Sequence, residues 1–167
     1  PIRELSLIAF PVRELFELKL DEFDLIVFDR YRRRGVLPRS YLSNIVEYVR
    51  KGGAFLEASG PTFASRLSLA NSPLREILPA LPTGKITERG FRPRITDKGY
   101  RHPVTAGLAR GGRLDETGKR VEAASWGRWL RQIDANPDRG VVLIDGVEER
   151  PLLLLDRVGE GRVAHLL

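Results

Sequence analysis

Ser59 is the residue of this chain best placed by type for nucleophilic chemistry, because it follows a short apolar run and precedes Gly60 and Pro61. A serine hydroxyl attacks only when a base lies beside it, and the chain offers His102 and His165. The residues around Ser59 lack the Gly-x-Ser-x-Gly pattern of a hydrolase elbow. We therefore expect no catalytic residue, no base near Ser59, and a Ser59 side chain that caps the following helix. The alternative is a hydrolase or amidotransferase-like enzyme that uses Ser59 with either histidine, or an acid in the same crevice.

Cofactor and metal chemistry find little support in the composition. The 167 residues contain no cysteine, which removes disulfides, thiolate metal sites and any cysteine nucleophile. The two histidines lie apart from clustered acids, so we expect neither a metal site nor a cofactor. A histidine at a turn, such as His102, more often ties a loop to the core through hydrogen bonds.

The turn at residues 59–62 is the candidate binding site. It leads from a predicted strand into a predicted helix, where backbone N–H groups and the positive end of the helix dipole attract an anion. Ligands of open α/β sheets bind beyond the carboxyl ends of the strands, where Asp29 and Arg30 should also lie, near the basic residues 32–34. The predicted crevice consists of Asp29, Arg30, Ser59, Gly60, Pro61, Thr62 and His102.

The elements that position this crevice are read from apolar periodicity. Residues 24–29 consist of a wholly apolar run between Asp24 and Asp29, typical of a strand buried on both faces of a parallel sheet. Residues 38–51 carry apolar side chains at helical spacing and end at two glycines, which predicts an amphipathic helix. Residues 54–59 form the next strand. Such a strand–helix–strand unit requires a right-handed crossover between parallel strands.

The rest of the chain adds weaker elements. We expect another strand at residues 5–10, a helix from 61 to 69, a short helix at 72–78, and a loop-rich region at 83–114 with short extended pieces at 85–87 and 94–96. Strands at 141–144, 150–156 and 162–167 follow, the last two as a hairpin. The sequence predicts one α/β domain over residues 1–167, a flavodoxin-like three-layer sandwich whose mostly parallel sheet ends in an antiparallel hairpin.

The formal charge of +6 permits attraction to nucleic acid or to acidic partners. Residues 84–101 are basic and include Phe91 and Tyr100, but no recognisable nucleic-acid module is present. A basic nucleic-acid-binding module is therefore kept only as a third alternative. Trp126 and Trp129 are expected to pack beneath the loop region rather than to present an aromatic patch.

No apolar run in the chain approaches the ~20 residues that cross a bilayer. The sequence begins at Pro1 without Met, so we expect it to be a piece of a longer protein whose membrane anchor, if one exists, lies outside these residues.

Five segments, taken in order, cover nearly the whole chain: residues 23–29, residues 48–56 with Gly60 and Pro61, residues 72–74 with Leu78 and Pro79, residues 102–108, and residues 151–163. Together they resemble the class I glutamine amidotransferase-like domain of large bacterial membrane proteins, where it often accompanies a von Willebrand factor A-like region.

The resemblance implies a flavodoxin-like sheet, transmembrane segments elsewhere in the host protein, and other protein domains as partners. An active member of this superfamily has Cys at the strand-to-helix turn and a His-x-Glu pair after a late strand. Here the turn offers Ser59, and His165 is followed by Leu166 and Leu167. The expectation is a non-catalytic domain of a membrane-associated protein, serving assembly or the binding of a ligand or partner.

Overall fold

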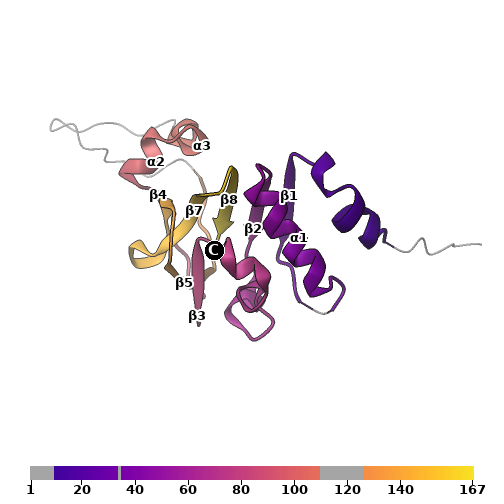
Figure 1. Ribbon diagram of the computed structural model, residues 1–167. Helices are drawn as coiled ribbons and strands as arrows, with labels where there is room; N and C mark the ends of the chain where they lie inside the picture. The colour runs from indigo at the N-terminus through magenta and orange to yellow at the C-terminus, as the bar shows by residue number, and fades with distance from the viewer. Residues whose placement is uncertain (1–9, 34, 110–125) are drawn as a thin grey trace, which may run out of the picture.

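A six-stranded mixed sheet forms the centre of the computed structural model, which describes residues 10–33, 35–109 and 126–167 (Figure 1). The first three strands pair in parallel and the remaining pairs are antiparallel, so that four of the six strands run in one direction. This confirms the predicted α/β class. In spatial order the strands are β1 (Leu25–Asp29), β2 (Ala54–Ala58), β8 (Gly161–Leu166), β7 (Pro151–Val158), β6 (Val141–Asp145) and β4 (Arg94–Ile95).

Helix α1 (Arg39–Arg50) joins β1 to β2 and covers one face of the sheet. Its apolar side chains at helical spacing, Leu42, Ile45 and Val49, are buried, as the periodicity predicts. Burial of each such side chain stabilises the fold by roughly 1.5–3 kcal/mol. The chain leaves the helix through Gly52, whose φ of 122° is rarely open to residues with a side chain.

Strand β1 differs from its prediction, because only one of its faces is buried. Ile26 and Phe28 point into the core, whereas Leu25 and Val27 are each 50% exposed. The apolar run alone could not show that β1 lies at the edge of the sheet, where its second face is left uncovered.

The helix predicted for residues 61–69 is absent. Three short 3-10 turns follow instead, two of them at the start and end of this range, and the Ser68 and Ser72 side chains accept hydrogen bonds from backbone N–H groups that a continuous helix would use. The last turn lies where the short helix at 72–78 was expected. The turns are η3 (Pro61–Ala64), η4 (Leu69–Asn71) and η5 (Pro73–Glu76).

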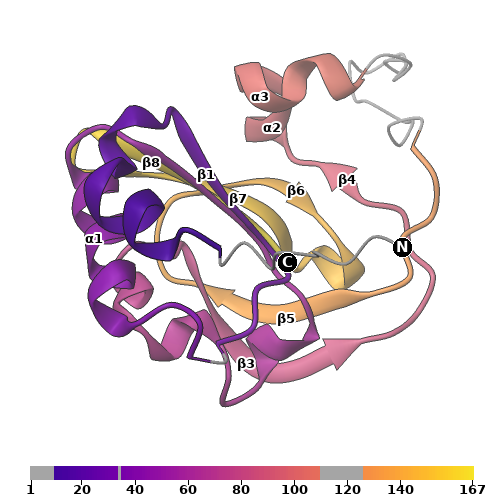
Figure 2. The same cartoon turned by 90° about the vertical axis from the view of Figure 1, so that its right-hand side faces the viewer.

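The start of the region expected to be loop-rich belongs to β3 (Ala80–Thr87), which forms a second, two-stranded antiparallel sheet with β5 (Gln132–Pro137), a strand that the sequence did not predict. The extended pieces expected near residues 85 and 94 are parts of β3 and β4. Figure 2 shows α1 beside β8 and, on the other side of the view, α2 and α3 above β4. The remaining elements are η1 (Glu14–Leu18), η2 (Leu20–Glu22), α2 (Asp97–Arg101), α3 (Pro103–Ala106), η6 (Gly107–Ala109) and η7 (Val147–Glu149).

The C-terminal hairpin of β7 and β8 forms as predicted, turning at Gly159 and Glu160. Beside it, a small apolar cluster around Leu143 and Leu152 includes the half-buried Trp126 and Trp129. The Trp126 indole N–H donates to the Pro93 carbonyl at 2.9 Å, which agrees with the predicted packing role.

Two expectations fall partly or wholly outside the described residues. The strand predicted at residues 5–10 lies there except for Phe10, which is exposed coil, and Arg34 lies there as well. Across the three described stretches, no helix combines the length and the apolar character needed to cross a membrane.

Candidate functional site

The carboxyl ends of β1, β2 and β8 meet at one edge of the sheet, because the three strands are parallel neighbours. Backbone hydrogen bonds continue past the strand ends and hold the loops together there. Arg30 N–H donates to the Ala58 carbonyl at 2.7 Å, and Ser59 N–H donates to the Leu166 carbonyl at 2.8 Å. The loops after β1 and β2 are thus fixed against each other before any side chain contributes.

A pocket of about 370 Å³ opens between these two loops. Five of the seven residues predicted for the crevice line it, and it gains Arg32 and Arg131. Three guanidinium groups against the single carboxylate give the lining a formal charge of +2. The lining residues are Asp29, Arg30, Arg32, Gly60, Pro61, Thr62 and Arg131.

The backbone brings the pocket walls unusually close. Arg30 has a φ of 47°, the left-handed region that few residues with a side chain occupy, and strain of this kind gathers at functional sites. Gly60 faces it so closely that a Cβ atom built at Gly60 would lie 2.9 Å from Arg30 Cβ. A glycine is therefore required where the loop after β2 passes the loop after β1.

The three arginines of the pocket retain free hydrogen-bonding capacity. Arg32 is exposed and forms no ion pair within the described part of the chain. Arg131 uses Nε for Glu88 at 2.9 Å, which leaves its terminal nitrogens. Arg30 Nε lies 3.8 Å from Asp29 Oδ1, with both side chains about three-quarters exposed, and such surface pairs contribute little, about 0–1 kcal/mol.

Ser59 lies just behind the pocket and is not alone. Its Oγ is 3.0 Å from His165 Nε2 and 3.4 Å from Glu57 Oε1. The prediction of no base near Ser59 is therefore wrong. The reason is register: Glu57 on β2 stands opposite His165 on β8, so both side chains share one face of the sheet beside the serine.

The prediction that Ser59 caps a helix is also wrong. The residue before the turn η3 is Gly60, no side chain caps this turn, and the turn has four residues. Pro61 begins it and has no N–H, so the helix-dipole argument for an anion site loses its basis. The positive character of the pocket comes from arginine side chains instead.

His165 is fully buried, with Phe63 packed edge-on at a ring distance of 4.9 Å. Burial disfavours the imidazolium and lowers the pKa of His165 to about 3, so the ring is neutral at physiological pH. Among the residues that the structure describes, Nδ1 has no hydrogen-bond partner. The ring therefore lacks the acidic partner that orients the histidine of a Ser-His-Asp triad.

Glu57 is 1% exposed and is the acid that sequence reasoning missed. Burial raises its pKa to about 8; the hydrogen bond from Ser59 opposes the shift and the nearby Asp29 carboxylate adds to it. Glu57 is thus protonated at neutral pH. A lone acid within the apolar strand 54–58 was the available signal, since acids are rarely fully buried without a partner.

The three groups together form a neutral buried network at pH 7. Because the pKa of His165 is near 3 instead of 6.5, protonation of its ring costs roughly 5 kcal/mol more free energy than protonation of an exposed histidine. Glu57 still holds its own proton and cannot remove one from Ser59. The geometry is that of a serine beside a base, but the protonation states do not activate the hydroxyl.

His102 lies outside the pocket, although the sequence grouped it with the crevice. Its Nδ1 accepts a hydrogen bond from Val104 N–H at 3.2 Å and so caps α3, a local contact rather than the expected tie between a loop and the core. Arg33, one of the basic residues 32–34 expected near the crevice, does not line the pocket and donates hydrogen bonds to the Asn71 and Arg66 carbonyls. Within the described ranges no group of three acids or histidines is arranged to hold a metal ion.

The basic segment 84–101 is partly neutralised in the structure. Arg89 pairs with Glu148 at 2.8 Å and Arg94 pairs with Glu149 at 2.7 Å. Paired charges reduce the field that phosphates would meet, so the nucleic-acid alternative gains no support from this segment.

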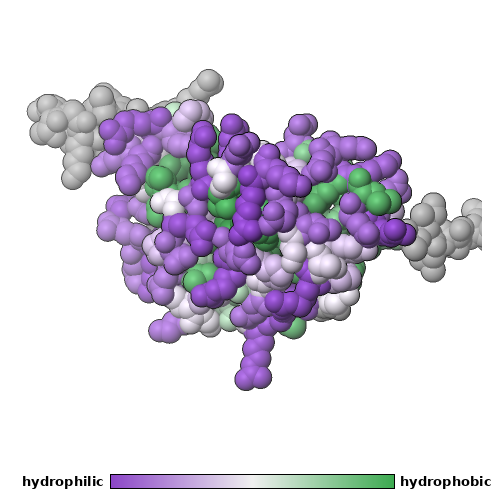
Figure 3. Space-filling view, in the orientation of Figure 1, coloured by the Kyte–Doolittle hydropathy of each residue, from purple (hydrophilic) through white to green (hydrophobic). Residues whose placement is uncertain are grey.

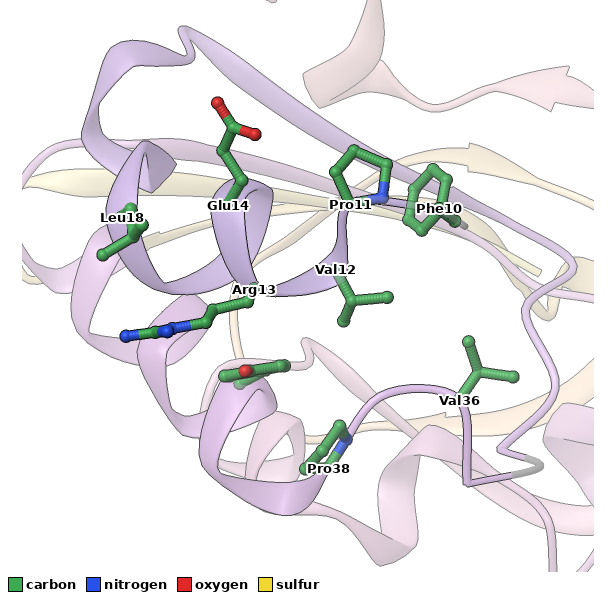
Figure 4. Close-up of a pocket in the computed structure, with 9 residues that line it drawn as sticks. Phe10, Pro11, Val12, Arg13, Glu14, Leu18, Val36 and Pro38 are labelled. Carbon is green, nitrogen blue, oxygen red and sulfur yellow. The ribbon is translucent and has the colours of Figure 1, made fainter. Parts of the chain in front are cut away.

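A larger hollow of about 570 Å³ lies at the N-terminal turn (Figure 4). Its lining is mostly apolar, and its charged members already have partners, since Arg13 pairs with Glu17 and Glu14 with Lys19. Hydrophilic residues cover most of the molecular face in Figure 3, with apolar residues in separate patches. The hollow is lined by Phe10, Pro11, Val12, Arg13, Glu14, Leu18, Val36, Pro38 and Tyr41.

Comparison with known proteins identifies the fold and no activity. No family profile matches the chain, and no curated protein matches it. Two solved structures are similar over 95% of the chain with a TM-score of 0.68: cytoplasmic protein STM1381 from Salmonella typhimurium LT2, at 20% identity, and cytoplasmic protein STM3548 from Salmonella typhimurium, at 22%. The chain spans 64% of the length of each.

A part of a glycosidase also shares the fold. The β-galactosidase from Rahnella sp. R3 is similar over 90% of this chain and 21% of its own, at 15% identity and a TM-score of 0.57. Likeness at these identities extends to the architecture alone. Function must be argued from the site.

Proposed function

We propose that this chain is a class I glutamine amidotransferase-like domain that binds a ligand or partner through the arginine pocket and performs no amidotransferase chemistry. The observation that carries the proposal is the pocket itself. It lies at the carboxyl ends of parallel strands, the usual ligand edge of an open α/β sheet, and brings Arg131 to Arg30 and Arg32 of the loop after β1.

The absence of catalysis is argued from the protonation of the network behind the pocket. The amidotransferase nucleophile is a cysteine, and this chain has none. Ser59 would have to replace it with His165, whose low pKa makes it a poor base, and with Glu57, which is protonated. The hydrogen bonds of Ser59 serve instead to satisfy two buried polar groups.

The proposal places the domain in a membrane-associated protein, where other protein domains, including ones of the same chain, are its partners. This part is supported by the resemblance of the five ordered segments alone. It requires no cofactor and no metal ion.

An enzymatic assay tests the proposal. The purified chain and its Ser59→Ala variant are incubated with glutamine and with p-nitrophenyl acetate at pH 7, and ammonia and p-nitrophenol are measured. We expect both proteins to match the buffer background. Turnover that the wild type shows and Ser59→Ala loses would mean that the domain is an enzyme.

A hydrolase is the second candidate function, favoured by the 3.4 Å contact between Ser59 Oγ and the Glu57 carboxyl group. In this alternative Glu57 becomes a carboxylate as the pH rises through its pKa of about 8 and accepts the serine proton while Ser59 attacks an ester carbonyl. The proton then passes to the departing alcohol, and water hydrolyses the acyl-serine to release the acid. Ester hydrolysis would increase between pH 7 and 9 and would be lost in Glu57→Gln. A pH profile that is flat and equal in both proteins excludes it.

A further inference from the structure

We infer that the arginine pocket recognises the phosphate group of a small phosphate monoester that also carries hydroxyl groups. The inference rests on the proposed binding function and names its ligand class. It is argued from the charge, donor geometry and size of the pocket, and from the one carboxylate in its wall.

Charge separates the candidate anions first. The lining carries three guanidinium groups and one carboxylate, a formal +2. A phosphate monoester brings about −1.5 to −2 at pH 7 and nearly neutralises this charge. A simple carboxylate brings one negative charge and a free amino acid none, so both leave the pocket positive.

Donor geometry supports the same group. Each guanidinium offers planar paired N–H donors that match phosphate oxygens, and backbone N–H groups are not needed. Arg32 has no competing ion pair within the described residues, and Arg131 keeps its terminal nitrogens. The bond from Arg30 N–H to the Ala58 carbonyl holds the backbone of Arg30 at the pocket wall, so its side chain starts from a fixed point.

Size and the carboxylate define the rest of the ligand. A pocket of about 370 Å³ exceeds a bare phosphate and falls in the ~300–1,000 Å³ range of small-molecule sites. Asp29 accepts hydrogen bonds only, and beside a phosphate it disfavours further anionic oxygens. The remainder of the ligand must therefore donate, as a hydroxyl group does.

Isothermal titration of the whole chain tests the inference at pH 7.5 and low salt, with glycerol 3-phosphate, inorganic phosphate, acetate and glycine as probes. We expect glycerol 3-phosphate to bind at least about tenfold more tightly than acetate, since the second negative charge of its phosphate adds a charge-assisted hydrogen bond, and about 1.4 kcal/mol of binding free energy is tenfold in affinity. Arg32→Ala should weaken this binding about tenfold. Arg75→Ala, the same change at an exposed residue outside the pocket, should leave it unaltered.

Asp29→Asn tests the hydroxyl part. Removal of the negative charge should tighten inorganic phosphate and reduce the preference for glycerol 3-phosphate over it. An unchanged preference refutes the role of Asp29. Vesicles of phosphatidylcholine with phosphatidic acid form a further arm of the experiment, because this lipid carries the same phosphate group but its glycerol hydroxyls are acylated. If the chain binds these vesicles through Arg32 and does not bind glycerol 3-phosphate, the inference of a soluble ester is overturned.

The outcomes separate this inference from the function beneath it. If acetate or glycine binds more tightly than the phosphates and Arg32→Ala still weakens it, the pocket is a ligand site but the phosphate inference is wrong. If no probe binds in an Arg32-dependent manner, the binding function of the pocket fails as well.

Discussion

The protonation of Glu57 gives a quantitative prediction for the variant Glu57→Gln. Glutamine has nearly the same shape and cannot ionise, so it keeps the polar contact with Ser59 and removes the titration. The folded pKa of about 8 lies above the ordinary value of 4.5. Between these pH values the unfolded chain releases the Glu57 proton and the folded chain keeps it, so Glu57 destabilises the fold increasingly as the pH rises.

The magnitude follows from the size of the shift. Each unit of pKa difference corresponds to about 1.4 kcal/mol, so the full penalty above pH 8 is roughly 5 kcal/mol. The free energy of unfolding of Glu57→Gln, measured by urea denaturation, should therefore gain about 1.4 kcal/mol on the wild type for each pH unit between pH 5 and 8.

The matched control is Glu160→Gln, at an exposed position in the turn between β7 and β8. Its difference from the wild type should stay nearly constant over the same pH range. If Glu57→Gln behaves like this control, the carboxyl group is ionised in the folded protein, and the argument against catalysis by the network behind the pocket loses its basis.

Three further predictions concern the same region and its support. The pKa of His165 is about 3 in the folded protein and 6.5 in the unfolded chain, so the unfolded chain binds a proton first and the wild type loses stability as the pH falls from 6.5 towards 3. Acid titration followed by circular dichroism measures this loss, and His165→Asn is expected to lack it. Ser59→Ala leaves two buried polar groups unpaired and should lower the free energy of unfolding by about 1–3 kcal/mol at pH 6; no loss would show that the contacts contribute nothing. Gly161→Ala would drive a Cβ into the Val49 carbonyl oxygen and should lower the free energy of unfolding by about 3 kcal/mol or more in thermal denaturation. Gly107→Ala, where the added Cβ meets open space, is the control and should be nearly neutral.

The predictable parts of the fold are those set by local pattern. The apolar spacing within residues 38–51 and the glycine stop determine α1, and the two β-rich runs around Gly159 determine the hairpin of β7 and β8. The turn at residues 59–62 and the pair Asp29 and Arg30 also meet at one edge as predicted, because parallel strands align their carboxyl ends.

The missed parts depend on pairing between distant segments. Arg131 enters the pocket from a segment about a hundred residues beyond Arg30, and nothing local marks it. The contact of Ser59 with His165 requires the register of β2 against β8, which no short-range pattern specifies. The turns after Pro61 were mistaken for a helix because proline suits a helix start and a tight turn alike.

The placement of β8 between β2 and β7 also affects how the protein folds. During synthesis β1, α1 and β2 emerge early, but the strand that completes the hydrogen bonds of β2 emerges more than one hundred residues later. Such long sequence separation slows folding and keeps the inner edge of β2 exposed to wrong partners on the ribosome. The nascent chain is therefore most prone to aggregation before residues 161–166 are released, and a truncation that removes them leaves the early unit without a central strand.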